Sequence, residues 1–153
     1  MIVDLTTIKD RETAFDFSLE PSDIDLESES ERLTGVVKVA GKVKKGIVQA
    51  DVAGKIATAV EMECNRCLSP VEKSLDFEFN AAFITPENYT QEKEAELKTD
   101  DLEVSIFEGD KLDLTELVRE QILLNLPLQV LCREDCQGLC QKCGANLNLI
   151  DCN

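Results

Sequence analysis

Seven cysteines and no histidine constrain this chain more than any other feature of its sequence. Five cysteines lie in "CREDCQGLCQKCGANLNLIDCN", residues 132–153, and the other two form "CNRC" at Cys64 and Cys67. The first residues lack the basic and apolar regions of a secretory signal, and no stretch approaches the roughly 18 apolar residues that cross a membrane. We therefore expect a soluble, cytoplasmic protein whose thiols stay reduced, and there clustered cysteines indicate metal rather than disulfides.

The paired cysteines have the spacing of zinc knuckles, in which a tight turn presents two thiolates to one ion. Pro70 follows Cys67 closely and Gly144 follows Cys143 directly, so neither pair is expected at the start of a helix, where an oxidoreductase would need it. A structural Zn²⁺ is therefore predicted, although four thiolates also suit an iron–sulfur cluster, which nothing in the sequence favours. The candidate ligands are Cys64, Cys67, Cys132, Cys136, Cys140 and Cys143, with Cys152 as a further one.

Seven cysteines cannot fill two sites of four, so three groupings of the ligands stay open. The first is a local quartet, which closes only short loops: Cys132, Cys136, Cys140 and Cys143. The second joins the two upstream cysteines to Cys132 and Cys136 and would staple a strand end to the tail. The third joins the two CxxC pairs, as in a zinc ribbon. The second is narrowly favoured because it gives both upstream cysteines a partner.

The sequence offers no positive sign of an enzyme. Without histidine there is no Ser–His or Cys–His nucleophile system, and a closed site of four cysteines has no open position for catalysis. A glycine-rich phosphate loop of the G-x-x-x-x-G-K type is also absent. We therefore predict a non-enzymatic protein without a small-molecule substrate. The alternative is a thiol–disulfide oxidoreductase or redox switch that uses the CxxC pairs.

The hydrophobic pattern predicts an α+β fold: a mostly antiparallel β-sheet or partial barrel with one main helix and a Cys-rich tail. Val37, Val39 and Val43 alternate with lysines and alanine, as in a half-buried strand, and residues 71–85 show a similar pattern. "KKG" (44–46) and "AG" (53–54) are predicted turns. The helix is expected at about 113–126, with Asp113 and Glu116 forming a capping box and Pro127 ending it.

We predict one domain over residues 1–153, divided into four parts by composition. Residues 1–31 are acidic and are expected to be weakly structured, apart from a short strand at "FDFSL". Residues 32–85 form the β-rich part, and residues 86–103 are expected to form an acidic loop. Residues 104–153 contain the helix and the Cys-rich tail.

The formal charge of −15 argues against general nucleic-acid binding, which depends on Lys and Arg neutralising phosphates. One region, residues 38–55, is nevertheless basic. Its lysines include Lys38, Lys42, Lys44 and Lys45, and the alternation places the first three on one face of a strand. Two interpretations stay open: a solvated strand face, or a docking surface for phosphate or acidic protein.

Three segments together resemble the YceD family, which is named for large ribosomal RNA subunit accumulation: "CNRCLSPV", the helix end "ILLNLPL", and "CREDCQGLCQKCGANLN". The resemblance implies a bacterial cytosolic protein linked to the synthesis, processing or stability of 23S rRNA. It also implies a frequent gene neighbour that encodes a small ribosomal protein of the large subunit. It supplies no catalytic residues to map. Relatives often carry a further Cys or His cluster after "NLN", whereas this chain ends in "DCN", one ligand short of a second complete site.

The resemblance and the charge together predict a ribosomal protein or assembly factor of the large subunit as the partner, docked by an acidic surface. Candidate residues for this contact are Glu92, Glu94 and Glu96. Local contact between the basic stretch and rRNA is the alternative. No membrane partner is expected.

Overall fold

A computed structural model describes residues 1–6, 11–47, 49–84, 104–106 and 111–152. The predicted acidic loop 86–103, with Glu92, Glu94 and Glu96, lies outside the described residues. No helix among the described residues has the length and apolar character needed to cross a membrane.

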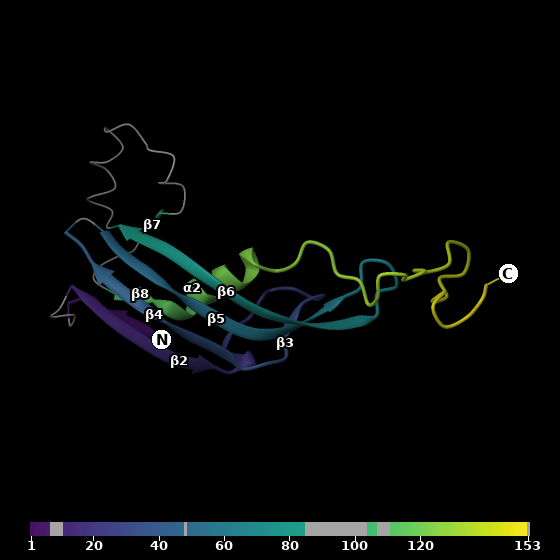
Figure 1. Cartoon of the computed structure of the whole chain (residues 1–153), viewed down its shortest axis with the longest axis horizontal. Helices are drawn as coiled ribbons and strands as arrows, with labels where there is room; N and C mark the ends of the chain where they lie inside the picture. The colour runs from purple at the N-terminus through teal and green to yellow at the C-terminus, as the bar shows by residue number, and fades with distance from the viewer. Residues whose placement is uncertain (7–10, 48, 85–103, 107–110, 153) are drawn as a thin grey trace, which may run out of the picture.

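The main sheet has the strand order β2-β4-β5-β6-β7, and the short strand β3 pairs with β5 (Figure 1). All of its pairings are antiparallel except that of β6 with β7. The strands are β2 (Glu12–Leu19), β3 (Arg32–Leu33), β4 (Val37–Lys45), β5 (Gln49–Glu63), β6 (Pro70–Ile84) and β7 (Val104–Ile106). The sheet does not close into a full barrel, and this open antiparallel sheet with one α-helix confirms the predicted α+β class.

Smaller elements cover one face of this sheet. The 3₁₀ turn η1 (Pro21–Asp23) follows β2, and β1 (Ile2–Asp4) pairs with β8 (Lys111–Asp113) in a second, two-stranded sheet. The helix α2 (Leu114–Leu124) begins directly after β8 and lies against the main sheet (Figure 1). Its length of 11 residues is shorter than predicted, because it ends three residues before Pro127.

The core lies between α2 and the sheet face that the alternating pattern predicts. Val37, Val39 and Val43 are all buried, and they share one cluster with apolar side chains of β5 and β6. The helix adds four buried residues to this cluster, namely Leu114, Leu117, Val118 and Ile122. These spacings of three and four place all four side chains on one face of the helix, as a core-facing helix requires.

The start of α2 differs in detail from the prediction. Asp113 is the N-cap residue, but its carboxylate accepts a hydrogen bond of 2.9 Å from the N–H of Thr115. Glu116 does not complete a capping box; it forms an ion pair with Arg119 at 3.0 Å. The Glu116 carboxylate pairs with Arg119, one turn further along the helix, instead of accepting from the backbone N–H of Asp113 as a capping box requires.

The short strand predicted at "FDFSL" is present within β2, but the prediction that the rest of the N-terminal part is weakly structured is wrong for the residues that the structure describes. β2 pairs with β4 over eight positions, from Glu12 opposite Lys44 to Leu19 opposite Val37. Beyond it, the side chains of Ile24 and Leu26 are buried in the core. The acidic composition does not predict this ordered structure, because the segment is held in place by contacts with β4 and α2, which are distant in sequence.

Arg119 of α2 attaches this N-terminal segment to the helix. Its Nε donates to the carbonyl oxygen of Asp25 at 2.6 Å, and its guanidinium lies 3.0 Å from the Glu27 carboxylate. Arg119 is mostly buried, so its planar group holds a chain segment that is far away in sequence.

The prediction of a turn at "AG" (53–54) is also wrong, because β5 continues through both residues. Gly54 lies opposite Gly41 of β4, where the two strands approach closely. A Cβ atom on Gly41 would lie 2.3 Å from the carbonyl oxygen of Ala53 and 2.7 Å from the Phe15 ring. Both glycines are therefore needed for interstrand packing and not for a turn.

Replacing Gly41 with alanine should lower the free energy of unfolding by about 1–3 kcal/mol, because backbone atoms must move to admit the methyl group. Urea denaturation followed by circular dichroism measures this change. The matched control is Ala40→Thr at the neighbouring exposed position, which should stay within about 0.5 kcal/mol of the unchanged protein. Equal stability of both variants would contradict the close packing described here.

Candidate metal centre

The first cysteine pair lies in a tight turn at the tip of the β5–β6 hairpin. Glu63 opposite Pro70 is the last paired position of the two strands, and Cys64 follows at once, as the alternation predicts. The N–H of Leu68 donates to the carbonyl oxygen of Cys64 at 2.9 Å, and Leu68 has a φ of 61°. The turn therefore directs Cys64 and Cys67 to the same side.

The tail brings two more cysteines to this turn. The Sγ atoms of Cys64, Cys67, Cys132 and Cys136 all lie within 4.8 Å of one another. Cys64 and Cys136 are separated by 3.7 Å between sulfurs, and Cys67 and Cys132 by 3.6 Å. A disulfide needs about 2 Å. Four thiolates around zinc at about 2.3 Å would stand about 3.8 Å apart, so these two separations are close to the edge length of such a tetrahedron.

Backbone donors and burial set the electrostatics of these thiols. The N–H groups of Cys67, Arg66 and Cys132 donate to the Cys64 sulfur and lower the pKa of Cys64 to about 6. Loss of hydration, together with the neighbouring thiols, raises the pKa of Cys132 to about 12. Four thiolates in so small a space repel one another. A divalent cation at their centre would remove this conflict, because each thiolate could then ionise against it.

Polar contacts hold the tail against the hairpin tip. The N–H of Asn65 donates to the carbonyl oxygen of Val130 at 2.7 Å, and the Asn65 side chain accepts from the Val130 N–H at 2.5 Å. Arg66 Nη1 donates to the carbonyl oxygen of Cys136 at 3.0 Å. Residues 130–136 are therefore tied to the hairpin by bonds that need no metal.

Two further polar residues lie beside the sulfurs. Ser69, with its Oγ 3.3 Å from the Cys67 sulfur, holds the pKa of Cys67 below its usual value through its hydroxyl and its N–H. The side-chain amide of Asn148 donates to the Cys136 sulfur at 3.3 Å. The sequence analysis missed these residues and Asn65. Their signal was small polar residues inside and beside the cysteine motifs, in "CNRCLS" and "GANLN".

The structure distinguishes among the three groupings by geometry. The two upstream cysteines lie with Cys132 and Cys136, which is the grouping that joins the hairpin to the tail. Cys140 and Cys143 lie instead with Cys152, in a separate group whose sulfurs are also within 4.8 Å of one another. That any of these seven thiols binds zinc stays a prediction.

The surroundings of the first cysteine pair do not resemble a thiol–disulfide active site. Both CxxC pairs lie in turns, and the one α-helix in the described part of the chain, Leu114–Leu124, contains neither. Cys64 is fully buried and Cys67 is 5% exposed, so a substrate disulfide has no direct access to either sulfur.

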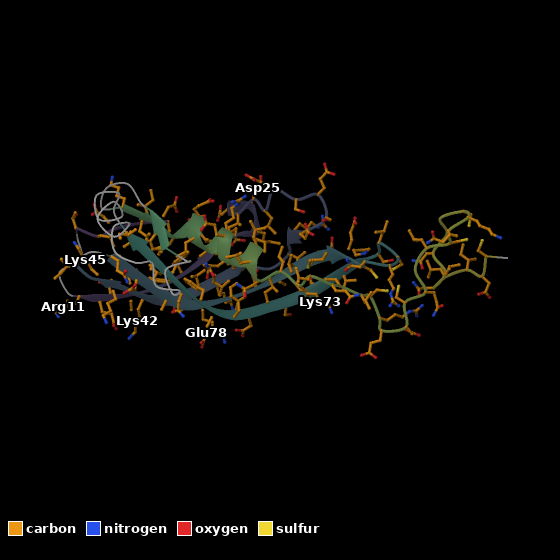
Figure 2. The ribbon with its side chains drawn as sticks, turned by 90° about the horizontal axis from the view of Figure 1, so that it is seen from above. Arg11, Asp25, Lys42, Lys45, Lys73 and Glu78 are labelled. Carbon is orange, nitrogen blue, oxygen red and sulfur yellow. The ribbon has the colours of Figure 1, made fainter. Side chains whose placement is uncertain are left out.

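The predicted lysine face is present on the side of the sheet away from α2. Figure 2 shows Lys42 and Glu78 projecting from this outer face, whereas Asp25 lies on the helix side. Lys42 forms an ion pair with Glu12 at 2.7 Å, and Lys55 forms one with Asp76 at 2.7 Å. Each pairing raises the pKa of its lysine, because the carboxylate favours the charged form.

The four lysines of the predicted basic surface therefore differ in their surroundings. Lys38, Lys42 and Lys44 are exposed on the outer face, as predicted. Lys45 lies at the end of β4, and its Nζ donates to the carbonyl oxygen of Leu5 at 2.9 Å. Lys42 and Lys45 are thus already paired with groups of this chain, and a partner for this surface stays a prediction.

A model of the YceD family, described as large ribosomal RNA subunit accumulation protein YceD, matches residues 52–153. This range includes most of the β5–β6 hairpin, the helix and all seven cysteines. The chain belongs to the YceD family. The match confirms the resemblance seen in the three sequence segments. No solved structure matches this YceD chain at a significant level.

Similar proteins come from bacteria and plants. An uncharacterized protein of Mycobacterium bovis is 33% identical over 105 residues, which are 69% of this chain and 47% of that protein. Protein YlbN of Bacillus subtilis, also uncharacterized, is 27% identical over 124 residues, or 79% of this chain and 66% of YlbN. The chloroplastic large ribosomal RNA subunit accumulation protein YCED homolog 1 of Zea mays is 25% identical over 167 residues, which cover 95% of this chain and 56% of the maize protein. The chain thus spans about half the length of the mycobacterial relative.

Replacing Asn65 with alanine should lower the free energy of unfolding by about 1–3 kcal/mol, because the buried Val130 N–H loses its acceptor. Hydrogen exchange should also become faster at Val130, while the amides of β4 and β5 keep their protection. Mass spectrometry of peptides that cover residues 126–136 measures this change.

A suitable control is Asn80→Ala on the exposed side of β6, which should change neither quantity. Unchanged exchange at Val130 in the Asn65 variant would show that the tail is not attached through this residue.

Proposed function

We propose that this chain is a non-enzymatic factor in biogenesis of the large ribosomal subunit, acting in the cytoplasm to support synthesis, processing or stability of 23S rRNA. The observation that carries the proposal is membership of the family named for large ribosomal RNA subunit accumulation. The maize relative, which is named as a chloroplastic homolog of this accumulation protein, supports it. Within this role, the chain serves as a binding module whose tail is fixed by a structural Zn²⁺.

The geometry of four sulfurs supports a metal at the hairpin tip. The sulfurs of Cys64, Cys67, Cys132 and Cys136 all lie within 4.8 Å of one another, and two of their separations, 3.7 and 3.6 Å, are close to the edge of a zinc–thiolate tetrahedron. Three of the four are buried, and backbone N–H groups already point at the Cys64 sulfur, as thiolate ligands require. Such a closed site stabilises structure and leaves no coordination position for a substrate. The zinc would link β5 and β6 to the tail.

The charge distribution supports a basic protein as the partner. The chain carries a net charge of −15, and carboxylates already pair with two outer-face lysines, Lys42 and Lys55. The same face presents Glu72, Asp76 and Glu78 from β6 to solvent. Acidic groups at a surface speed association with a basic ribosomal protein or assembly factor. Direct contact with rRNA phosphates would need more unpaired cations than this face offers.

The metal is tested with Cys136→Ser. This variant should lose about one zinc per chain, show a lower Tm, and expose Cys64 and Cys67 to alkylation, because the remaining ligands no longer enclose the ion. Elemental analysis, thermal denaturation and thiol labelling measure the three effects.

The control for this test is Ser74→Ala on the exposed side of β6, which should keep zinc, Tm and labelling unchanged. Metal-free native protein with a rapidly alkylated Cys64 would favour the alternative, a thiol–disulfide oxidoreductase, and would refute the structural zinc.

The partner is tested with two variants that each reverse the charge of three residues on the outer face of the sheet and each break one ion pair. One changes Lys38, Lys42 and Lys44 to Glu, and the other changes Glu72, Asp76 and Glu78 to Lys; each breaks one of the two cross-strand ion pairs. Co-purification with precursors of the large subunit should fall more in the acidic-to-basic variant, and most clearly at low salt.

A third variant reverses Glu92, Glu94 and Glu96, the acidic residues that the sequence singles out, and should also reduce co-purification. Loss of the precursors by the lysine variant alone, with the acidic variants still bound, would refute docking on a basic protein and favour rRNA contact. Failure of all variants and of the unchanged chain to co-purify would refute the role in large-subunit biogenesis.

A further inference from the structure

The second CxxC pair lies in a tight turn with the backbone geometry of a knuckle. In residues 140–145, the N–H of Cys140 donates to the carbonyl oxygen of Ala145 at 2.8 Å. The N–H of Gly144 donates to the carbonyl oxygen of Cys140 at 2.9 Å. Gly144 has a φ of 73°, a left-handed conformation that glycine adopts without strain. The turn is thus closed by two backbone hydrogen bonds, one nested inside the other.

The same two hydrogen bonds close the first knuckle. There the N–H of Cys64 donates to the carbonyl oxygen of Ser69 at 2.9 Å, and the N–H of Leu68 donates to that of Cys64 at 2.9 Å. Leu68, the counterpart of Gly144, is also left-handed. The two turns also match one residue further out on each side, where Glu63 pairs antiparallel with Pro70 around the first turn.

The pair of Leu139 with Asn146 stands at the corresponding place around the second turn. Backbone N–H groups also point at the leading sulfur in both turns. The N–H of Lys142 lies 3.4 Å from the Cys140 sulfur, and the N–H of Cys143 donates to it as well. The second turn therefore repeats the backbone frame of the knuckle that belongs to the four-cysteine group, and this repetition points to a thiolate-binding role.

Cys152 supplies a third sulfur to the second knuckle. Its Sγ lies 3.3 Å from that of Cys140 and 3.2 Å from that of Cys143. Cys143 and Cys152 are exposed and Cys140 is half-buried, in contrast to the three buried cysteines of the first group. No further His, Cys, Asp or Glu of the described residues joins this group.

We propose that Cys140, Cys143 and Cys152 form a second Zn²⁺ site, with three protein thiolates and a fourth position that takes water or another exchangeable ligand. Three protein ligands plus one exchangeable ligand are the arrangement of open zinc sites, whereas four cysteines form closed ones. This site is additional to the structural zinc proposed above and does not depend on it.

Binding requires a small local shift. The sulfurs are about 0.5 Å closer than the edges of a zinc–thiolate tetrahedron, so they must spread as the ion enters. Cys152 lies outside the helices and strands and can move without breaking the hydrogen bonds of the knuckle. Because the site is more exposed and has one protein ligand fewer, zinc should leave it faster than the four-cysteine site, in which three of the cysteines are buried.

The test is the release of zinc from the full zinc-loaded chain to a chromogenic chelator, 4-(2-pyridylazo)resorcinol. We expect about two zinc ions per chain, released in a fast step and a slow step. Cys143→Ser and Cys152→Ser should each remove the fast step alone, and Cys136→Ser should remove the slow step alone. A single ion per chain that survives in the Cys152 variant would overturn the second site and leave the structural zinc intact.

Cobalt in place of zinc tests the open position. Imidazole, added as a small external ligand, should shift the visible absorption bands of the Co²⁺-loaded chain, and Cys152→Ser should abolish the shift because its site no longer holds the ion. The Cys136→Ser variant should keep the shift. Two bound Co²⁺ ions with bands insensitive to imidazole would overturn the open fourth position.

Discussion

The antiparallel pairing of β5 with β6 is the interaction on which the rest of this structure depends. Both strands are 15 residues long and are paired from Gln49 opposite Ile84 to Glu63 opposite Pro70. One part of this hairpin supplies buried side chains for the core beneath α2. The other part runs on to the tip, where Cys64 begins the first knuckle (Figure 1). A single hairpin thus joins the apolar core to the thiol cluster.

Beyond the core, sulfur and polar contacts replace apolar packing. The cluster at the tip consists of Cys64, Cys67 and Cys136, with only a few partly buried hydrophobic residues against it. Asn65 and Arg66 bind the backbone of the tail, so the tail is positioned before any metal is considered. A tail with so little apolar area to bury would gain most from the metal cross-link proposed above, which would account for the concentration of cysteines at one end of the chain.

Several elements could be predicted from local pattern, and several could not. The alternation from Val37 to Val43 identified β4 and its buried face, and the periodic leucines identified α2 within two residues. Gly54 was assigned to a turn because glycine has the same local signal in a turn and at a close strand crossing. Only the position of Gly41 across the sheet distinguishes the two. Residues 1–31 were predicted to be weakly structured apart from the strand at "FDFSL", because the order of this part comes from contacts with β4 and Arg119, which are distant in sequence.

The sequence by itself determined the class of the fold and the family, and it predicted a thiol-rich site, because hydrophobic period and cysteine spacing are local properties of the chain. It left three groupings of the cysteines open. Tertiary structure decided among them by geometry: folding β5 back on β6 carries Cys64 and Cys67 to the place that the tail reaches through Asn65 and Val130. The division of seven thiols into a mostly buried group of four and a more exposed group of three follows from that contact. Distances between segments about 65 residues apart are not contained in the spacing of any motif.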